Sequence, residues 1–317
     1  MLHERAVTTM TFRPLRSPRP AAALFGKLPC ALDFVRVNHD SAESIALDRW
    51  LQAALQRLAA RNRSWPPGQL TFAFAVDAEH GVVGVAADSR DRAGRRFPVA
   101  IYARIPRPPR VLCGTAALVL ASKPFVDGAR ALLALGAELS PTQVPLRLRR
   151  LCPPMASEVQ AAADELASDL ATRRLDAFAA PLFGAAPAPE SRARAALDRV
   201  RQRRSATGSP FECFELPVKS VHDVAVWAHW FERTHGRPSA ALWGLPEREA
   251  ALLASGPLPE RAPLFWTLPA QSYPQLCRTG EDTTALEPAG VGGGERSLAA
   301  VFDELAQSAT LAVSANR

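Results

Sequence analysis

The sequence predicts an α/β fold in which a mainly antiparallel sheet is flanked by helices. Three segments with strand-like patterns follow one another at 70–76, 81–89 and 96–105, and the connections between them are short. Short connections favour antiparallel pairing, so we expect these segments to form a meander. Segments with helical periodicity lie before and after them in the chain. Helices packed on such a sheet would bury its apolar side chains.

The segments before the meander carry their own boundary signals. An apolar run at 21–29 ends at a proline and predicts a strand that enters a turn. Residues 39–62 predict an amphipathic helix with Ser41 as its N-cap, and the Pro-rich segment 64–69 ends it. Trp50 is expected in the core, and the order strand, helix, three strands is typical of longin- or profilin-like layers. The predicted apolar face of the helix consists of Ile45, Leu47, Trp50, Leu51, Ala54, Leu55 and Leu58.

The second half of the chain alternates between helical and strand-like segments. Helices are predicted at 125–139, 157–182 and 191–204. The third is rich in arginine and could bind nucleic acid or an acidic membrane surface. Its apolar residues are too few for membrane insertion and no aromatic residues interleave for base stacking, so we expect a solvated helix. The pattern after it predicts strands at 211–218, 239–245 and 262–269, helices at 221–236 and 247–255, a mobile loop at 279–295 and a last helix at 296–309.

No linker separates the two halves, so we expect one domain. Residues 1–20 are expected to be a flexible tail, and residues 21–317 a single domain with an N-terminal part at 21–150 and a C-terminal part at 151–317. The net charge of +7 over 317 residues is mild and does not demand nucleic acid as a partner. No signal peptide or membrane span is recognisable, so the sequence predicts a cytoplasmic protein without membrane insertion.

Residue types that carry catalysis or bind metals form no recognisable motif. The Gly-Lys step at 26–27 lacks the upstream glycine and the following Ser or Thr of a phosphate-binding loop, and no G-x-S-x-G motif occurs. The histidines form no H-E-x-x-H, and the five cysteines form no C-x-x-C. We therefore expect no catalytic residues, no metal, no cofactor and no small-molecule substrate. A hydrolase that uses scattered Ser, His and Asp side chains is the alternative.

Three separated motifs in the first hundred residues carry a resemblance to a known family. They are Gly26-Lys27-Leu28-Pro29 followed by Asp33-Phe34-Val35-Arg36, then Asp48-Arg49-Trp50-Leu51-Gln52, and then DRAGRRFPV at 91–99. In this order, with similar gaps, they resemble the TagF (ImpM) family of type VI secretion-associated proteins. The resemblance covers residues 25 to about 105. The clearest departure from the family pattern is Leu32, which stands where the family has a glycine. The helix motif also differs, because it reads LDRW at 47–50 where the family has PWDRW.

The resemblance implies a non-enzymatic, cytoplasmic repressor of type VI secretion that acts after translation by binding a protein. The implied partner is the scaffold component of the apparatus that carries a forkhead-associated (FHA) domain. Because glycine permits backbone conformations that leucine disfavours, Leu32 would alter the loop that contains it. A longin-like platform for a small GTPase or ATPase is an alternative function, and it would place the contact on a sheet edge or a flanking helix.

Charged residues in the three motifs are the predicted partner-binding residues. The segment 87–97 concentrates arginines around Gly94, and guanidinium groups suit carboxylate or phosphate partners. A solvated hairpin tip is the alternative interpretation of this segment. Asp33 is expected either to cap the turn or to form an ion pair with Arg92 or Arg95. The predicted partner-binding residues are Lys27, Asp33, Arg36, Asp48, Arg49, Asp91, Arg92, Arg95 and Arg96.

Overall fold

The strands of the protein form one sheet that runs through both halves of the chain. The computed structural model describes residues 19–39, 41–76, 79–106, 114–140, 142–184, 188–206, 213–236, 239–244, 249–255, 276–278 and 295–315. Within these ranges the sheet has nine strands in the order β2-β1-β5-β4-β3-β7-β8-β6-β9. The strands are β1 (Ala22–Lys27), β2 (Phe34–Val37), β3 (Gln69–Ala75), β4 (His80–Ala87), β5 (Val99–Pro106), β6 (Cys213–Pro217), β7 (Ser239–Trp243), β8 (Ala250–Ser255) and β9 (Leu276–Arg278).

The fold class predicted from the sequence is confirmed. Neighbouring strands of the sheet pair antiparallel, except that β6 and β9 pair parallel. The meander β3-β4-β5 has the predicted order, and β2 is an additional strand that the sequence pattern did not indicate. The helices are α1 (Ala42–Ala59), α2 (Gly114–Ala121), α3 (Lys123–Ala134), α4 (Gln143–Leu148), α5 (Ala156–Thr172), α6 (Leu175–Phe183), α7 (Pro189–Ala206), α8 (Val221–His235) and α10 (Leu298–Ala315), with a 3-10 turn η1 (Gly136–Glu138).

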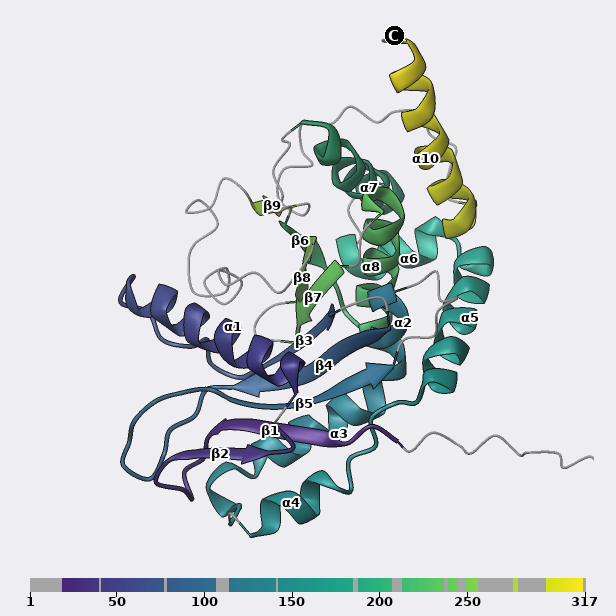
Figure 1. The fold of residues 1–317 in the computed structure, drawn as a ribbon. Helices are drawn as coiled ribbons and strands as arrows, with labels where there is room; N and C mark the ends of the chain where they lie inside the picture. The colour runs from purple at the N-terminus through teal and green to yellow at the C-terminus, as the bar shows by residue number, and fades with distance from the viewer. Residues whose placement is uncertain are drawn as a thin grey trace, which may run out of the picture.

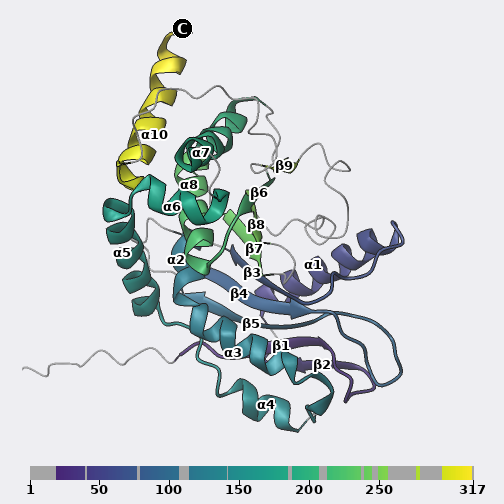
Figure 2. The same cartoon turned by 180° about the vertical axis from the view of Figure 1, so that it is seen from behind.

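Helices cover both faces of the sheet. Helix α1 lies across one face, and α2 and α3 lie on the opposite face, as Figure 1 and the reverse view in Figure 2 show. Side chains along each strand alternate between these layers. On β5, Ala100 and Tyr102 join the core beneath α1, whereas Ile101 and Ala103 join the core shared with α2 and α3. The alternation therefore produces two hydrophobic cores, one on each side of the sheet.

The N-terminal and C-terminal halves meet where β3 pairs with β7. Four residue pairs form this antiparallel contact, from Thr71 opposite Trp243 to Phe74 opposite Ala240. The guanidinium of Arg130 on α3 spans the junction, because it donates to Thr71 Oγ1 at 2.6 Å and to the Gly244 carbonyl at 3.1 Å. The two halves thus share both a sheet and a side-chain contact.

Four predictions from the sequence were wrong in detail. Ile45 was expected in the core but is 51% exposed, since it lies beyond the edge of the buried stripe of α1. The predicted helix 157–182 is two helices, because Arg173 is extended (ψ 124°) and its carbonyl accepts the amide of Leu298, at the start of α10. Segment 250–255 of the predicted helix 247–255 is β8, paired on both edges with β6 and β7.

The fourth error concerns the basic helix α7, which is not solvated all round. Ala193, Ala196, Leu197 and Val200 are buried, and their spacing of i, i+3, i+4 and i+7 defines a continuous helical stripe. Trp230 of α8 reaches this helix and donates through Nε1 to the Leu197 carbonyl at 2.8 Å. Arg192, Arg194, Arg199 and Arg201 lie outside this stripe and are partly exposed. The predicted strand 262–269, most of the predicted N-terminal tail and the predicted loop at 279–294 lie outside the described residues.

Gly26 brings β1 close to the start of β5. Its φ of 137° lies in a region that side chains disfavour. A Cβ atom at this position would lie 2.3 Å from the Pro98 carbonyl oxygen and 2.5 Å from the Val99 Cα. Both neighbours are backbone atoms, so they cannot rotate away. The glycine of the first motif therefore serves close packing of two strands.

We expect Gly26→Ala to lower the free energy of unfolding by about 3 kcal/mol, since it combines backbone strain with overlap against β5. Gly94→Ala is the matched control, because Gly94 also has a positive φ (83°) but an added Cβ would meet nothing within 4 Å. The control should lower the free energy of unfolding by only about 1–2 kcal/mol, which is the penalty for a side chain on left-handed backbone. Urea denaturation of both variants measures the difference, and equal losses would contradict the packing role.

Candidate functional site

The first and third motifs meet at one corner of the sheet. We call residues 88–97, which connect β4 to β5, the arginine hairpin, and residues 28–33, which connect β1 to β2, the adjoining turn. Arg92 N donates to the Ala31 carbonyl at 2.8 Å, and this bond links the hairpin to the turn through their backbones. The turn itself is closed by the Ala31 amide, which donates to the Leu28 carbonyl. The arginine hairpin and the adjoining turn together form the candidate site.

A buried ion pair lies beneath the arginine hairpin. Lys27 Nζ donates to Asp91 Oδ2 at 2.9 Å, and the two side chains are 8% and 0% exposed. The other carboxylate oxygen of Asp91 accepts the backbone amides of Ala93 (3.0 Å) and Arg95 (2.9 Å). Arg95 Nε donates to Asp91 Oδ2 at 2.7 Å, and its guanidinium also donates to the Leu32 carbonyl. Asp91 therefore holds Lys27, the tip of the hairpin and, through Arg95, the adjoining turn.

The ionisation of Asp91 follows from these contacts. Burial alone would raise the pKa of the carboxyl, because it disfavours the charged form. The hydrogen bonds from Lys27 and from the backbone and side chain of Arg95 oppose it, and they lower the pKa of Asp91 from its ordinary value of 3.8 to about 2. The carboxylate is consequently charged at neutral pH despite its burial.

An aromatic cluster supports the same corner from the α1 side. The rings of Phe25 and Phe34 stack with centroids 5.5 Å apart, and Phe97 of the hairpin meets Phe34 edge-on at 4.8 Å. The guanidinium carbon of Arg36 lies 5.4 Å from the centroid of Phe25, a cation–π contact. Arg36 is itself exposed, so the cluster orients this arginine while leaving it open to solvent.

The predicted site residues differ in exposure and in location. Lys27 and Asp91 are buried, so they position the corner and do not present a surface to a partner. Arg95 is exposed but bound to Asp91 and to the turn. The residues exposed to a partner at this corner are Asp33, Arg36, Arg92 and Arg96. Asp48 is half-buried and accepts from Gln52 at 2.8 Å, while Arg49 is exposed; both lie on α1.

The predicted ion pair of Asp33 with Arg92 or Arg95 is wrong. Asp33 Oδ1 accepts the amide of Phe34, the next residue, at 2.8 Å, and the carboxylate that meets Arg95 is Asp91. Leu32 does not take a positive φ, so leucine fits the turn without left-handed backbone. Its side chain is 60% exposed, which places an apolar group beside the arginines of the corner.

A pocket of about 390 Å³ opens beside the arginine hairpin. Leu28, Val99 and Leu133 contribute its apolar wall, and Asp88, Ser89, Arg90 and Arg96 contribute its polar wall. Arg90 and Arg96 lie directly opposite each other in an antiparallel bridge. Arg90 was not among the predicted site residues. Arg90 lies four residues before Gly94, and a hairpin turn at this glycine brings it opposite Arg96. This spacing is the sequence signal from which Arg90 could have been predicted as a site residue.

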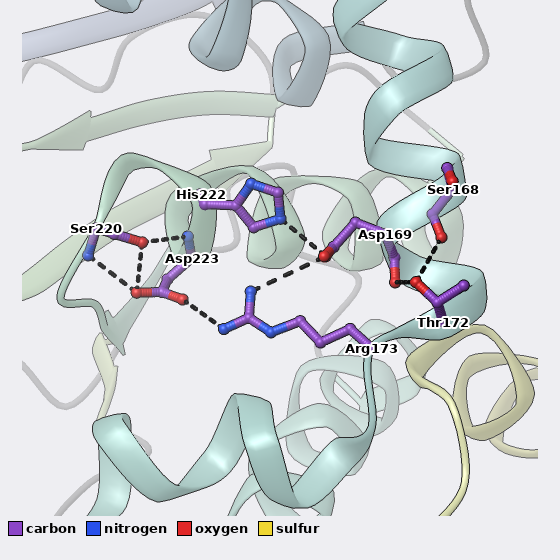
Figure 3. Close-up of polar contacts among 7 residues, drawn as sticks. All are labelled: Ser168, Asp169, Thr172, Arg173, Ser220, His222 and Asp223. Carbon is purple, nitrogen blue, oxygen red and sulfur yellow. Dashed lines mark hydrogen bonds and ion pairs between the residues drawn. The ribbon is translucent and has the colours of Figure 1, made fainter.

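A second polar cluster lies between α5 and α8, away from the motifs (Figure 3). His222 Nε2 and Asp169 Oδ2 are 2.8 Å apart, and Arg173 lies between Asp169 (3.9 Å) and Asp223 (3.6 Å). Asp223 also accepts the Ser220 amide and hydroxyl, each at 2.9 Å, in a capping box at the start of α8. Since the Ser220 hydroxyl contacts Asp223 and not His222, these side chains form a helix cap and an ion-pair link, not a nucleophile–base–acid triad.

His222 and His229 of α8 do not act together. His222 contacts Asp169, whereas His229 stacks on Phe302 of α10 with ring centroids 6.1 Å apart. Burial and, to a lesser extent, the charge of Arg233 lower the pKa of His229 to about 4. Among the described residues, no group of three or more His, Cys, Asp or Glu side chains is placed to hold a metal ion. No helix in these ranges combines the length and hydropathy of a membrane span.

Comparisons with known proteins identify the domain that contains the corner. Residues 23–151 match the family model of the TagF N-terminal domain, type VI secretion system-associated. The chain is also similar to PA0076 from Pseudomonas aeruginosa PAO1, known from a crystal structure, with 18% sequence identity and a TM-score of 0.38. That likeness covers 86% of this chain and 99% of PA0076. A search of curated proteins gives no match.

We expect Asp91→Asn to destabilise the protein at neutral pH, and the loss to shrink as the pH falls from about 4 to about 2. The carboxyl of Asp91 has a pKa of about 2 in the folded protein and a pKa of about 3.9 in an unfolded chain. Between these values the unfolded chain binds the additional proton, so the wild type loses the stabilisation that the asparagine variant never had.

Urea unfolding of both proteins across this pH range measures the effect. Asp33→Asn is the control, because its carboxylate is exposed and bonds only the neighbouring amide, so we expect little change at any pH. If the difference in the free energy of unfolding between wild type and Asp91→Asn stays constant from neutral pH to about pH 2.5, stability is not linked to the ionisation of Asp91 and the prediction is wrong.

Proposed function

This chain contains a TagF N-terminal domain, type VI secretion system-associated, at residues 23–151, and we propose that it represses type VI secretion by binding another protein. In this proposal the protein is cytoplasmic and non-enzymatic, and its partner is the scaffold component of the apparatus that carries an FHA domain. The repression acts after translation, because binding removes or blocks a component that is already made.

The observation that carries this proposal is the location of the exposed arginines. All the predicted partner-binding residues fall inside the matched domain, and Arg36, Arg92 and Arg96 are exposed around one corner of it. Within the described residues, neither Arg36 nor Arg92 has a carboxylate partner. Exposed guanidinium groups with open hydrogen-bonding capacity suit the carboxylates of an acidic protein surface.

The rigidity of the corner also supports a binding role. The buried ion pair of Lys27 and Asp91 and the backbone bond from Arg92 to Ala31 fix the arginine hairpin to the sheet. A surface that is already ordered loses less conformational entropy when it binds. Leu32 adds an exposed apolar side chain next to the arginines, and interfaces combine an apolar contact with a polar rim.

We expect Arg92→Glu to abolish repression without unfolding the protein. A strain that lacks the gene should secrete more type VI substrate, and the wild-type chain should lower this secretion again. With the purified FHA-domain component, Arg92→Glu should weaken binding at least about tenfold, because it replaces a favourable charge contact with repulsion.

Arg63→Glu is the matched control, since Arg63 is exposed in the loop after α1, outside the corner, and the charge change is the same. This variant should repress and bind as the wild type does. A wild-type chain that neither binds the FHA-domain component nor changes secretion would overturn the proposal. Loss of function in Arg49→Glu with Arg92→Glu intact would place the contact on α1 instead of the corner, and a flanking helix is also where a longin-like platform would have it.

A further inference from the structure

The two arginines that line the pocket are held on the same side of the arginine hairpin. Arg90 and Arg96 form an antiparallel bridge, and residues directly opposite in such a pair direct their side chains to the same side. Asp91 and Arg95, the next pair toward the tip, direct theirs to the other side, where they meet Lys27 and the adjoining turn. One side of the hairpin is therefore anchored and the other side lines the pocket.

The pocket has an excess of positive charge in its wall. Like charges directly opposite in an antiparallel pair are unfavourable unless an anion lies between or beside them. Arg96 has such a neighbour, because its guanidinium lies 3.2 Å from Asp88 Oδ2. Arg90 is exposed and has no carboxylate partner among the described residues. The wall thus carries two guanidinium groups and one carboxylate, and it lacks one negative charge.

The remainder of the pocket is apolar and built from rigid elements. Leu28 and Val99 are buried in the core at the ends of β1 and β5, and Leu133 lies near the end of α3. A volume of about 390 Å³ lies within the range of roughly 300–1,000 Å³ that ligand sites occupy. An occupant would therefore place an anionic group against the arginines and a short hydrocarbon segment against these three side chains.

We propose that this pocket binds a carboxylate side chain, aspartate or glutamate, presented by an acidic segment of a partner protein. The inference rests on the proposed function in so far as the partner is the protein that the corner binds. Arg90 would hold the carboxylate in a bidentate contact, since planar guanidinium and carboxylate groups match in geometry. Asp88 keeps Arg96 in place as the second wall of the site.

The charge of the wall favours a carboxylate over a phosphate. A carboxylate brings one negative charge and neutralises the single excess positive charge of Arg90, Arg96 and Asp88. A phosphate monoester brings about 1.5 to 2 negative charges at neutral pH, so part of its charge would face Asp88 without compensation. Asp88 is thus a residue that selects between the two kinds of anion.

The first test uses small probes on the purified full chain. N-acetylglutamate amide, N-acetylphosphothreonine amide and N-acetylglutamine amide are titrated separately, and binding is followed by ligand-observed NMR. We expect the glutamate probe to bind more tightly than both others. Binding of the glutamine probe that equals that of the glutamate probe, or tighter binding of the phosphothreonine probe, would overturn the proposal.

Three variants locate the binding. Arg90→Gln should weaken binding of the glutamate probe at least about tenfold, the loss of a charge-assisted contact. Asp88→Asn should strengthen binding of the phosphothreonine probe and narrow the preference between the two anions. The double variant Arg63→Gln/Arg150→Gln is the control, because both arginines are exposed outside the pocket, and it should bind as the wild type does. Unchanged affinity in Arg90→Gln would overturn the assignment of the site.

The outcome separates this inference from the function on which it rests. If the glutamate probe binds through Arg90 but the chain does not repress secretion, the pocket is a carboxylate site and the proposed function is wrong. If the chain represses secretion and Arg90→Gln binds the FHA-domain component as tightly as wild type does, the proposed function is supported and the pocket does not contact this partner.

Discussion

The buried lysine at the C-terminal end of β1, Lys27, determines how the corner of this protein is built. Lys27 is nearly inaccessible to solvent, and an isolated ammonium group in such a place would carry a large desolvation cost. Asp91 meets it from a connection 64 residues further along the chain. The same carboxylate also accepts two backbone amides and Arg95, so a single ion pair fixes the course of the arginine hairpin. Arg90, Arg92 and Arg96 take their positions relative to the sheet from this anchor.

The layers of the N-terminal half could be predicted because their patterns are local. Strand β3 alternates small and aromatic residues, and Trp50 marks the buried face of α1, where it packs on Phe72. Segment 250–255 could not be read in the same way, since an alanine- and leucine-rich run of this length suits a helix and a buried strand equally. Its pairing with β6 and β7 decides the outcome, and that pairing is a long-range property. The break at Arg173 likewise depends on Leu298, far away in the sequence.

The candidate site was only partly predictable for a related reason. Composition identifies 88–97 as a charged loop, but it does not say which carboxylate meets which cation. Asp33 and Asp91 both lie near arginines in the sequence, and only the fold shows that Asp91 faces inward while Asp33 faces solvent. A strict two-residue alternation from Ala86 and Ala100 would place Arg90 and Arg96 on the α1 side. The ladder is interrupted at Pro98, which has no amide to donate, and both arginines line the pocket with Leu133 of α3 instead.

The pairing of β3 with β7 has a consequence for any shortened form of the protein. The region matched to the TagF N-terminal domain ends at residue 151, so it contains β3 but not β7. Without β7, the backbone N–H and C=O groups of Thr71–Phe74 that face it would lose their partners, along a strand whose alternate residues are Leu70, Phe72 and Phe74. An apolar strand exposed in this way is a template for edge-to-edge association. In the full chain, β7 of the C-terminal half covers this edge.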